Sequence, residues 1–374
     1  MSAADADLAR SESPSPLDAV VNLAGFEPIA REVMAPAAFD YVAGGAGDEW
    51  TLARNLEAWR ERVLRPRVLV DVATVATATT MLGAPVAMPV GVAPMASHGL
   101  AHPEAERATA RAAAAAGVPF TLSTMSTSSI EEVAAAAPDG IRWFQLYTQR
   151  DRAFARRLTQ RAEAAGFRAI MLTVDLPVLG NRERDRRSGF VLDVPLGNFA
   201  SERAVDPDEA AGPGEEASFA APGGVRHVSL RWEDLAEIHS WTSLPLVLKG
   251  ILTAEDARLA VEHGADAIVV SNHGARQLDG VPAGIDALEE VVAAVGGRTE
   301  VWVDGGVRRG VDVVVALALG ARGVLVGRPI LYALAAGGQA GVERALGLLR
   351  AELETALALM GTATVEDVGR AHVR

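Results

Sequence analysis

The chain has 374 residues, with 35 basic and 48 acidic side chains and a formal net charge of −13. This balance argues against a nucleic-acid-binding protein, because such proteins carry a basic patch and a high pI, and it equally disfavours docking on anionic lipid. The chain contains no cysteine, so disulfides, thiolate nucleophiles, zinc fingers and iron–sulfur clusters are excluded.

The N-terminal segment is acidic and polar and lacks the basic start and apolar core of a secretory signal. We expect residues 1–16 to be a disordered tail and residues 17–374 to form a single domain. No apolar run approaches the ~20 residues that a membrane span needs, which favours a cytoplasmic protein with no membrane partner. Residues 17–82 contain a helical pattern, an AGGAGDEWTL loop and a short hairpin, and we expect them to pack on the rest of the domain.

From residue 84 onward, short apolar runs alternate with amphipathic helical patterns. The runs are rich in Val, Ile and Leu and almost continuously apolar, as parallel strands buried on both faces are. Eight strand-and-helix units predict an α/β fold, a (β/α)8 TIM barrel, and a doubly wound parallel sheet is the alternative. The expected strands are residues 86–93, 119–123, 143–147, 169–175, 244–249, 267–271, 300–304 and 323–327.

Only the connection after the fourth strand is too long for one helical crossover, so we expect an insertion at about residues 176–229. Its middle is acidic and rich in Pro, Gly and Ala, a composition that cannot bury a core. Because it follows a strand, it belongs to the carboxyl face, where barrel active sites are built. We interpret the insertion as a mobile lid, and a plain surface loop is the alternative.

Polar side chains mark the carboxyl ends of the expected strands, and in a barrel these ends converge on one site. They are Gln145, Tyr147, Thr173, Asp175, Lys249, Ser271, His273 and Arg276. His273 is a candidate general base, Asp175 can orient its imidazole, and Arg276 can hold a substrate carboxylate. His98 and His102, which follow the first strand, are the other histidines within reach of this site.

Two glycine–arginine loops, DGGVRRG and VGRP, follow the seventh and eighth expected strands. Barrels often bind phosphate at this place, and Arg308 and Arg328 can supply charge-assisted hydrogen bonds to it. Lys249 is the only lysine of the chain. Because arginine cannot replace a compact or titrating cation, its retention indicates a functional role.

Taken together, the motifs resemble those of the FMN-dependent L-2-hydroxy acid oxidases and dehydrogenases, a family that includes glycolate and lactate oxidases. The resemblance covers about residues 20–372. It is carried by FDYVAGGAGDEWTL, APMASHGLAHPE, WFQLYTQRD, LTVDLPVLGNR, LPLVLKGI, SNHGARQLDG, DGGVRRG and VGRP. It implies FMN as cofactor, oxidation of an L-2-hydroxy acid to the 2-keto acid, and a homotetramer or its dimer.

The resemblance also implies a role for each matching position. His273 is the base, Asp175 supports its protonated form, and Lys249 lies beside N1 and O2 of the flavin. Tyr147 binds the substrate hydroxyl, Arg276 and Tyr41 hold the substrate carboxylate, and Arg182 lies near it. The flavin contacts are Pro94, Met95, Ala96, Ser123, Gln145, Thr173, Ser271, Asp304, Gly306, Arg308, Gly327 and Arg328.

Two positions bear on the subtype. Ala96 stands where oxidases of the family tend to have alanine, and APMASHGLAH is closest to the lactate oxidases, so we expect oxygen to be reduced to hydrogen peroxide. Met125 occupies the substrate-pocket position that is tryptophan in glycolate oxidases and tyrosine in lactate oxidases. A flexible methionine favours a larger aliphatic or aromatic hydroxy acid.

Other functions stay open at this point. Within the family, the alternatives are a dehydrogenase that reduces a quinone or another carrier and a lactate 2-monooxygenase. No membrane-anchoring insert is evident after the fourth strand, which argues against a membrane-bound dehydrogenase. From the residues alone, a Schiff-base aldolase that uses Lys249 is a different class, and a flavin-binding protein without turnover is a third.

Overall fold

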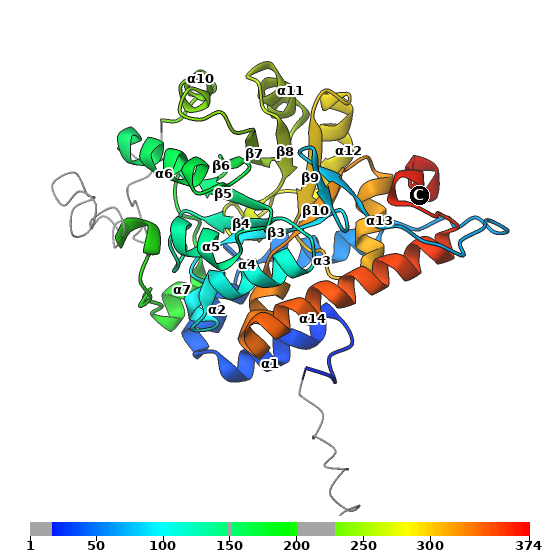
Figure 1. The fold of residues 1–374 in the computed structure, drawn as a ribbon, viewed down its shortest axis with the longest axis horizontal. Coiled ribbons are helices and arrows are strands. Elements are labelled where there is room, and N and C mark those ends of the chain that lie inside the picture. The colour runs from blue at the N-terminus through cyan, green and yellow to red at the C-terminus, as the bar shows by residue number, and fades with distance from the viewer. Residues whose placement is uncertain (1–16, 149–150, 201–228) are drawn as a thin grey trace, which may run out of the picture.

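The computed structural model describes residues 17–148, 151–200 and 229–374 (Figure 1). The expected tail at 1–16 and the middle of the expected lid lie outside these residues. Eight parallel strands close into a barrel in the order β10-β3-β4-β5-β6-β7-β8-β9, which confirms the barrel and rules out the doubly wound sheet. The strands are β3 Val90–Met95, β4 Phe120–Ser123, β5 Arg142–Leu146, β6 Ile170–Thr173, β7 Leu246–Ile251, β8 Ala267–Val270, β9 Glu300–Asp304 and β10 Gly323–Val326.

The start of the first barrel strand differs from the sequence prediction. Val86 ends the hairpin strand β2 (Ala84–Val86), which pairs antiparallel with β1 (Thr79–Met81), and β3 begins only at Val90. Pro89 lies between them and has no N–H to donate to a ladder, so one continuous strand is interrupted there. The apolar run therefore serves two strands.

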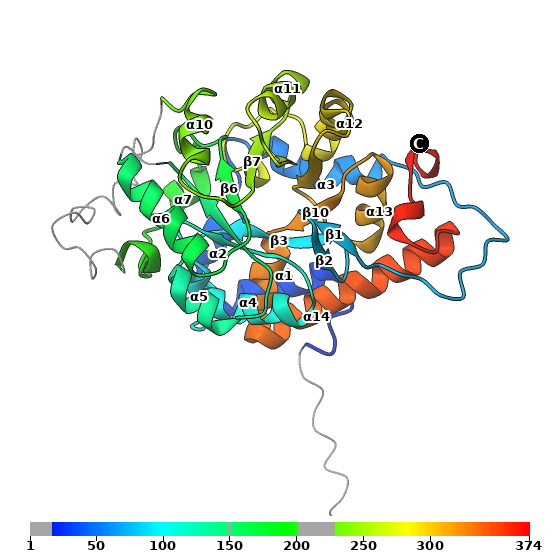
Figure 2. The ribbon, with the colours of Figure 1, turned by 45° about the horizontal axis from the view of Figure 1, so that its top comes forward.

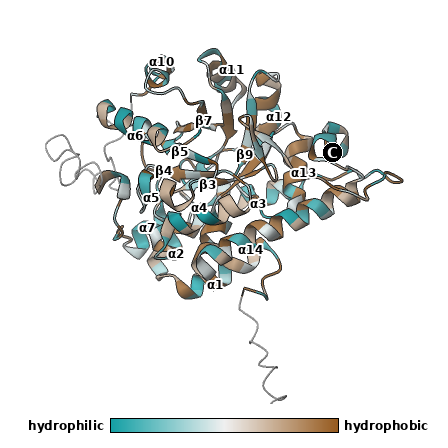
Figure 3. Ribbon diagram, viewed as in Figure 1, coloured by the Kyte–Doolittle hydropathy of each residue, from teal (hydrophilic) through white to brown (hydrophobic). Residues whose placement is uncertain are grey.

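Helices surround the barrel, and their starts follow the sequence (Figures 1 and 2). Ser129, Asp151 and Thr253 each accept backbone N–H groups at the beginning of a helix, which satisfies donors that the first turn leaves open. The helices are α4 Ala105–Ala115, α5 Ile130–Ala136, α6 Arg152–Ala164, α7 Glu183–Ser188, α10 Asp234–His239, α11 Ala254–Glu262, α12 Gly284–Val295, α13 Gly310–Ala318 and α14 Arg328–Met360. The strands are mostly hydrophobic, whereas the helices mix hydrophobic and hydrophilic residues (Figure 3).

Three helices precede the hairpin and pack on the barrel: α1 Phe26–Val33, α2 Pro36–Ala43 and α3 Trp50–Arg60. Helix α1 packs against α14 (Figure 1), which is bent at Gly337 and Gly338. Helix α3 reaches the loop after β9, where the Trp59 indole N–H donates to the Gly305 carbonyl at 2.9 Å. Among the described helices, none has the length and apolar character needed to cross a bilayer.

The barrel interior is filled by a layer of large side chains. Trp143 from β5 and Trp302 from β9, on opposite sides of the barrel, stack with ring centroids 4.8 Å apart and an angle of 3° between the ring planes. Met81 and Val86 of the hairpin join the same buried cluster. Because side chains alternate along a strand, Gln145 and Asp304 share the inward face with the two tryptophans and form the next layer toward the carboxyl end.

Candidate active site

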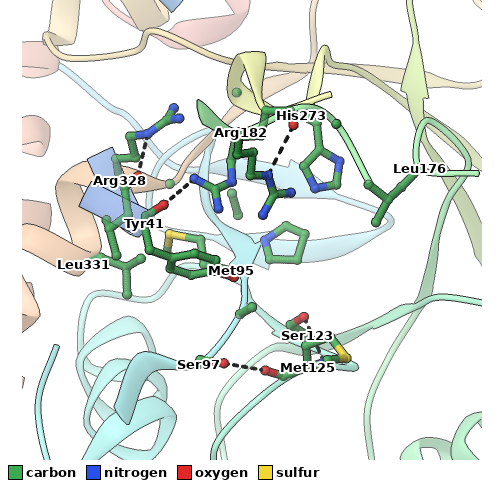
Figure 4. A pocket seen from close by; sticks show the side chains of 18 of the residues that line it. Tyr41, Met95, Ser97, Ser123, Met125, Leu176, Arg182, His273, Arg328 and Leu331 are labelled. Carbon is green, nitrogen blue, oxygen red and sulfur yellow. Dashed lines mark hydrogen bonds between the residues drawn. The ribbon is translucent and has the colours of Figure 1, made fainter. Parts of the chain in front are cut away.

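A cavity of about 1110 Å3 opens at the carboxyl ends of the barrel strands (Figure 4). Small-molecule sites usually measure about 300–1,000 Å3, so this cavity has room for a cofactor together with a substrate. It is lined by all but four of the site residues expected from the sequence. The four are Asp175, Gln145, Thr173 and Ser271, and each hydrogen-bonds either a lining residue or another of the four.

A histidine–carboxylate pair lies in the cavity wall. Nδ1 of His273 is 2.8 Å from Oδ1 of Asp175, and the Tyr147 hydroxyl is 3.4 Å from Nε2. Burial lowers the pKa of His273 below its ordinary value, although Asp175 opposes this shift. Burial also pushes the pKa of Asp175 upward, but His273 and Lys249 outweigh it and hold that pKa below the ordinary range. At neutral pH the pair is therefore a neutral imidazole oriented by an ionised carboxylate.

Lys249 is nearly buried in the cavity wall, with 4% of its surface exposed. Its Nζ donates to the Ser271 hydroxyl at 2.9 Å and lies 3.4 Å from Oδ2 of Asp304. The other carboxylate oxygen of Asp304 is buried without a hydrogen-bond partner among the described residues. A buried acceptor of this kind is costly unless a donor completes it, which points to a ligand with hydroxyl or N–H groups.

Five arginines line the cavity: Arg182, Arg186, Arg276, Arg308 and Arg328. In the described part of the chain, no carboxylate lies within 4 Å of any of them, so none forms an ion pair there. Burial and the neighbouring cations lower the pKa of Arg182 to about 10 and that of Arg328 to about 9. Even so, Arg182 and Arg328 stay charged at neutral pH. The basic side chains of the wall outnumber its carboxylates, Asp185 and Asp304, so the cavity suits anions.

Backbone carbonyls at the end of α2 orient two of these arginines. Arg328 donates from Nε to the Val42 carbonyl at 2.9 Å and from Nη2 to the Gly44 carbonyl at 2.7 Å. Arg276 donates to the carbonyls of Tyr41 and Gly44. The carboxyl end of a helix carries partial negative charge that favours such cations. The same contacts fix the end of α2 and hold Tyr41 at the cavity.

The loop after β9 contains a glycine, Gly306, at a position where no other residue fits. Gly306 has φ +89°, and a Cβ added there would lie 1.7 Å from the Asn55 carbonyl oxygen of α3. The next turn is fixed by Asp312, which accepts the backbone N–H groups of Arg308 and Arg309. The close approach to α3 thus sets the position from which Arg308 enters the cavity.

Apolar side chains form much of the remaining wall, and the sequence analysis identified only some of them. Met125 lies on the loop after β4, and its carbonyl accepts from the N–H and hydroxyl of Ser97 (Figure 4). Further aliphatic residues come from the insertion, among them Leu176, Leu192 and Leu196. In the same insertion Phe190 stacks on Tyr41 with ring centroids 4.3 Å apart. The apolar run FVLDVPL, at residues 190–196, could have indicated that this part of the insertion is buried at the cavity. The lid interpretation was based instead on the acidic middle of the insertion.

The two further histidines do not line this cavity. His98 is buried, its Nδ1 lies 3.0 Å from the Thr109 hydroxyl, and burial lowers its pKa. The Nδ1 of His102 accepts the backbone N–H of Glu104 at the protein surface. Although both histidines follow the first barrel strand in the sequence, their contacts are structural and neither side chain reaches the cavity.

The fold and the cavity define a class, namely (β/α)8 enzymes with a histidine–aspartate pair and an anion-binding pocket. The chain belongs to the FMN-dependent dehydrogenase family, whose model matches residues 30–374. It is 50% identical over 356 residues to the glycolate oxidase of Spinacia oleracea, covering 95% of each chain. It is also 50% identical over 353 residues to an L-lactate oxidase of Nostoc sp., covering 93% of this chain and 96% of that one.

Solved structures give the same result. Mandelate oxidase with (S)-4-hydroxymandelic acid matches with a TM-score of 0.85 and 45% identity, covering 95% of this chain and 98% of the other. The protein is therefore an FMN-dependent 2-hydroxy acid oxidase, as the sequence motifs predicted. This result removes the Schiff-base aldolase as an alternative.

Proposed function

We propose that this chain binds FMN in the cavity and oxidises an L-2-hydroxy acid with an apolar side chain to the 2-keto acid, reducing oxygen to hydrogen peroxide. One observation carries the proposal. The arginines of the cavity, which have no ion-pair partner among the described residues, share its wall with a neutral histidine that an ionised aspartate orients. A cofactor phosphate and a substrate carboxylate are the two anions that this arrangement lacks.

The residues present fit FMN. Arg308 and Arg328 would hold its phosphate, and Gly306 and Gly327, which line the cavity, would lie beside it. The open oxygen of Asp304 would accept from the ribityl chain, and Lys249 supplies a compact cation beside the ring. The ring would lie against Pro94, Met95, Ala96 and Ser123, with Gln145, Thr173 and Ser271 in reach of its polar edge. Bound FMN accepts the two electrons that leave the substrate.

The chain itself supplies orientation and proton transfer. Asp175 fixes the proton of His273 on Nδ1, so that Nε2 is free to take the proton of the substrate hydroxyl. The Tyr147 hydroxyl lies 3.4 Å from that nitrogen and would hydrogen-bond the same substrate oxygen. Arg276, Tyr41 and Arg182 would hold the carboxylate, because guanidinium groups match its geometry.

The apolar wall supports the substrate class. Met125, Leu192 and Leu196 line the cavity and offer no polar partner to a substrate side chain. This wall suits the methyl group of lactate and larger aliphatic or aryl groups better than the hydrogen of glycolate. Oxygen as acceptor is supported by Ala96 and by the oxidase relatives.

The test is a visible spectrum of the purified protein, recorded without oxygen before and after adding L-lactate, glycolate or (S)-mandelate. We expect a flavin band that bleaches with the acids that have apolar side chains and returns when air is admitted, with peroxide formed. A colourless protein that FMN does not reconstitute would refute the proposal. We also propose the homotetramer implied by the family resemblance, which analytical ultracentrifugation tests.

A further inference from the structure

The first part of the insertion, at residues 176–200, contains a buried asparagine, Asn198, that has no role in the proposed reaction. Asn198 is fully buried, with 0% of its surface exposed, although it belongs to a segment between two strands. We call residues 190–199 the wall segment, because it contributes Leu192, Val194 and Leu196 to the cavity. A buried polar side chain needs partners, and those of Asn198 connect this segment to a different part of the site.

The Asn198 amide binds the loop that carries Met125. Its Nδ2 donates to the carbonyls of Ser123 and Thr124 at 3.2 and 3.1 Å and to the Ser126 hydroxyl at 3.0 Å. Its Oδ1 accepts the backbone N–H of Ile130, the first residue of α5, at 3.0 Å. One amide therefore spans the whole loop from the end of β4 to the start of α5.

Neighbouring contacts give the joint a fixed geometry. The Gly197 N–H donates to the Ser126 carbonyl at 3.0 Å, and a Cβ on Gly197 would lie 2.5 Å from the Ser129 nitrogen. On the other side, the Phe199 ring packs on Phe154 of α6, with centroids 5.1 Å apart. The wall segment is thus held against the barrel at the residues that directly follow Leu196.

The loop that Asn198 binds also forms hydrogen bonds with helix α4. The buried carboxylate of Glu106 accepts the N–H groups of Thr127 and Ser128, each at 2.9 Å, and the N–H of His98 at 2.9 Å. Glu106 thereby ties the loops after β3 and β4 to α4. Among the residues that the structure describes, Asn198 is the one side-chain amide that connects this block, on which Met125 lies, to the wall segment.

We propose that Asn198 is a positioning residue that fixes the wall segment against the loop of Met125, and thereby sets the preference of the site for a bulky apolar substrate side chain. It acts through Met125 and Leu196, which line the cavity, and does not itself line it. The inference rests on the proposed function, since it concerns the substrate of the same cavity.

The main experiment compares Asn198→Ala with wild type in the FMN-loaded protein. Two ratios that compare a bulky with a small ligand are measured. The first is kcat/KM for (S)-mandelate divided by kcat/KM for L-lactate. The second is the affinity for phenylacetate divided by that for acetate, two carboxylates that do not react. We expect both ratios to fall about five- to tenfold, because a wall that is no longer held loses contact with a large side chain but not with a small one. FMN content should stay that of wild type.

A double-mutant cycle tests the route. If Asn198 acts through Met125, the same substitution in a Met125→Ala background should change the ratios by less than twofold. The matched control is Thr362→Ala, which removes a buried hydrogen bond to the Leu357 carbonyl far from the cavity. It should lower the melting temperature and leave both ratios at their wild-type values.

The outcomes separate the inference from the function on which it rests. Unchanged ratios in a folded, FMN-loaded Asn198→Ala protein, or an equal change in the Met125→Ala background, overturn the inference. If Asn198→Ala does not fold, Ser126→Ala removes one of its hydrogen bonds and decides by the same ratios. A wild-type protein that binds both carboxylates but oxidises no 2-hydroxy acid refutes the proposed function, and the affinity ratio still decides the role of Asn198.

Discussion

At the residue scale, two opposing influences act on His273. Burial lowers its pKa, and the nearby Asp175 raises it. The balance leaves an imidazole that is neutral near pH 7 and whose cation, once formed, is stabilised by a carboxylate 2.8 Å away. A general base needs both properties, because it must be unprotonated before the reaction and hold a proton after it.

Replacing His273 with glutamine should abolish turnover and leave flavin bound. Glutamine fills a similar volume but cannot take up a proton, and loss of a general base costs about 10²- to 10⁴-fold in rate. The measurement is the anaerobic rate of flavin bleaching by the best substrate. His102→Gln, a change at the surface outside the cavity, should keep the wild-type rate. Bleaching of the His273→Gln protein at the wild-type rate would contradict the assignment.

The dependence of kcat/KM on pH at acidic pH should show the titration of His273 beside Asp175. In wild type, kcat/KM should rise with pH as His273 loses its proton and then level off. Asp175→Asn removes the group that raises the pKa of His273, so the midpoint of this rise should move to lower pH while kcat falls. Asp266→Asn, at the amino end of the barrel where its carboxylate accepts the Leu246 N–H, should leave the midpoint in place. A midpoint that moves to higher pH would refute the mechanism.

At the element scale, the loop after β9 places two consecutive arginines in opposite surroundings. Arg308 lines the cavity, whereas Arg309 is half exposed and pairs with Glu352 of α14 at 3.3 Å. The difference follows from Gly306, which brings the loop against α3. The sequence analysis predicted Arg308 as the phosphate contact, and the structure gives the two arginines different surroundings, with Arg308 and not Arg309 in the cavity wall.

Arg308→Gln should weaken FMN binding by about 10- to 100-fold, because a hydrogen bond to a charged group contributes about 1.5–3 kcal/mol. The dissociation constant is measured by the fluorescence of FMN titrated with apoprotein. Arg309→Gln is the matched control, since it makes the same change one residue away and should leave the dissociation constant within twofold. Equal constants for the two variants would argue against a phosphate at Arg308.

At the scale of the whole molecule, the cavity concentrates buried positive charge in a chain whose net charge is −13. The arginines of the cavity repel each other, and within the described part of the chain they form no ion pair, so they destabilise the fold until an anion joins them. The cofactor should therefore contribute to folding stability as well as to chemistry, and its phosphate should carry much of that contribution.

FMN should raise the melting temperature of the apoprotein by roughly 3 °C at about 100 times its dissociation constant, where a ligand adds ~2.7 kcal/mol. Riboflavin at the same concentration should raise it clearly less, because it has the ring and ribityl chain but no phosphate. Differential scanning calorimetry measures both. An equal rise with the two ligands would show that the arginines do not act as a phosphate site.

Much of the barrel and of the site can be predicted from the sequence, because the strands recur at regular intervals and the site residues stand at their carboxyl ends. Buried parallel strands give apolar runs at regular intervals, and their ends carry the residues that converge, as Lys249 and His273 do. What the sequence left open depends on contacts between distant segments. Phe190 on Tyr41 and Asn198 on the loop of Met125 join segments with no shared pattern. The Val86 boundary was wrong because one apolar run serves two strands.

The stacked indoles of Trp143 and Trp302 give the molecule a built-in optical reporter. They lie one inward-facing layer below Gln145 and Asp304, which is about 7 Å along a strand. At that separation the excited indoles would pass their energy to a flavin resting on that layer. Ultraviolet-excited emission at the tryptophan wavelength should therefore dim as FMN enters and recover as it leaves, so that occupancy can be followed in real time without a label.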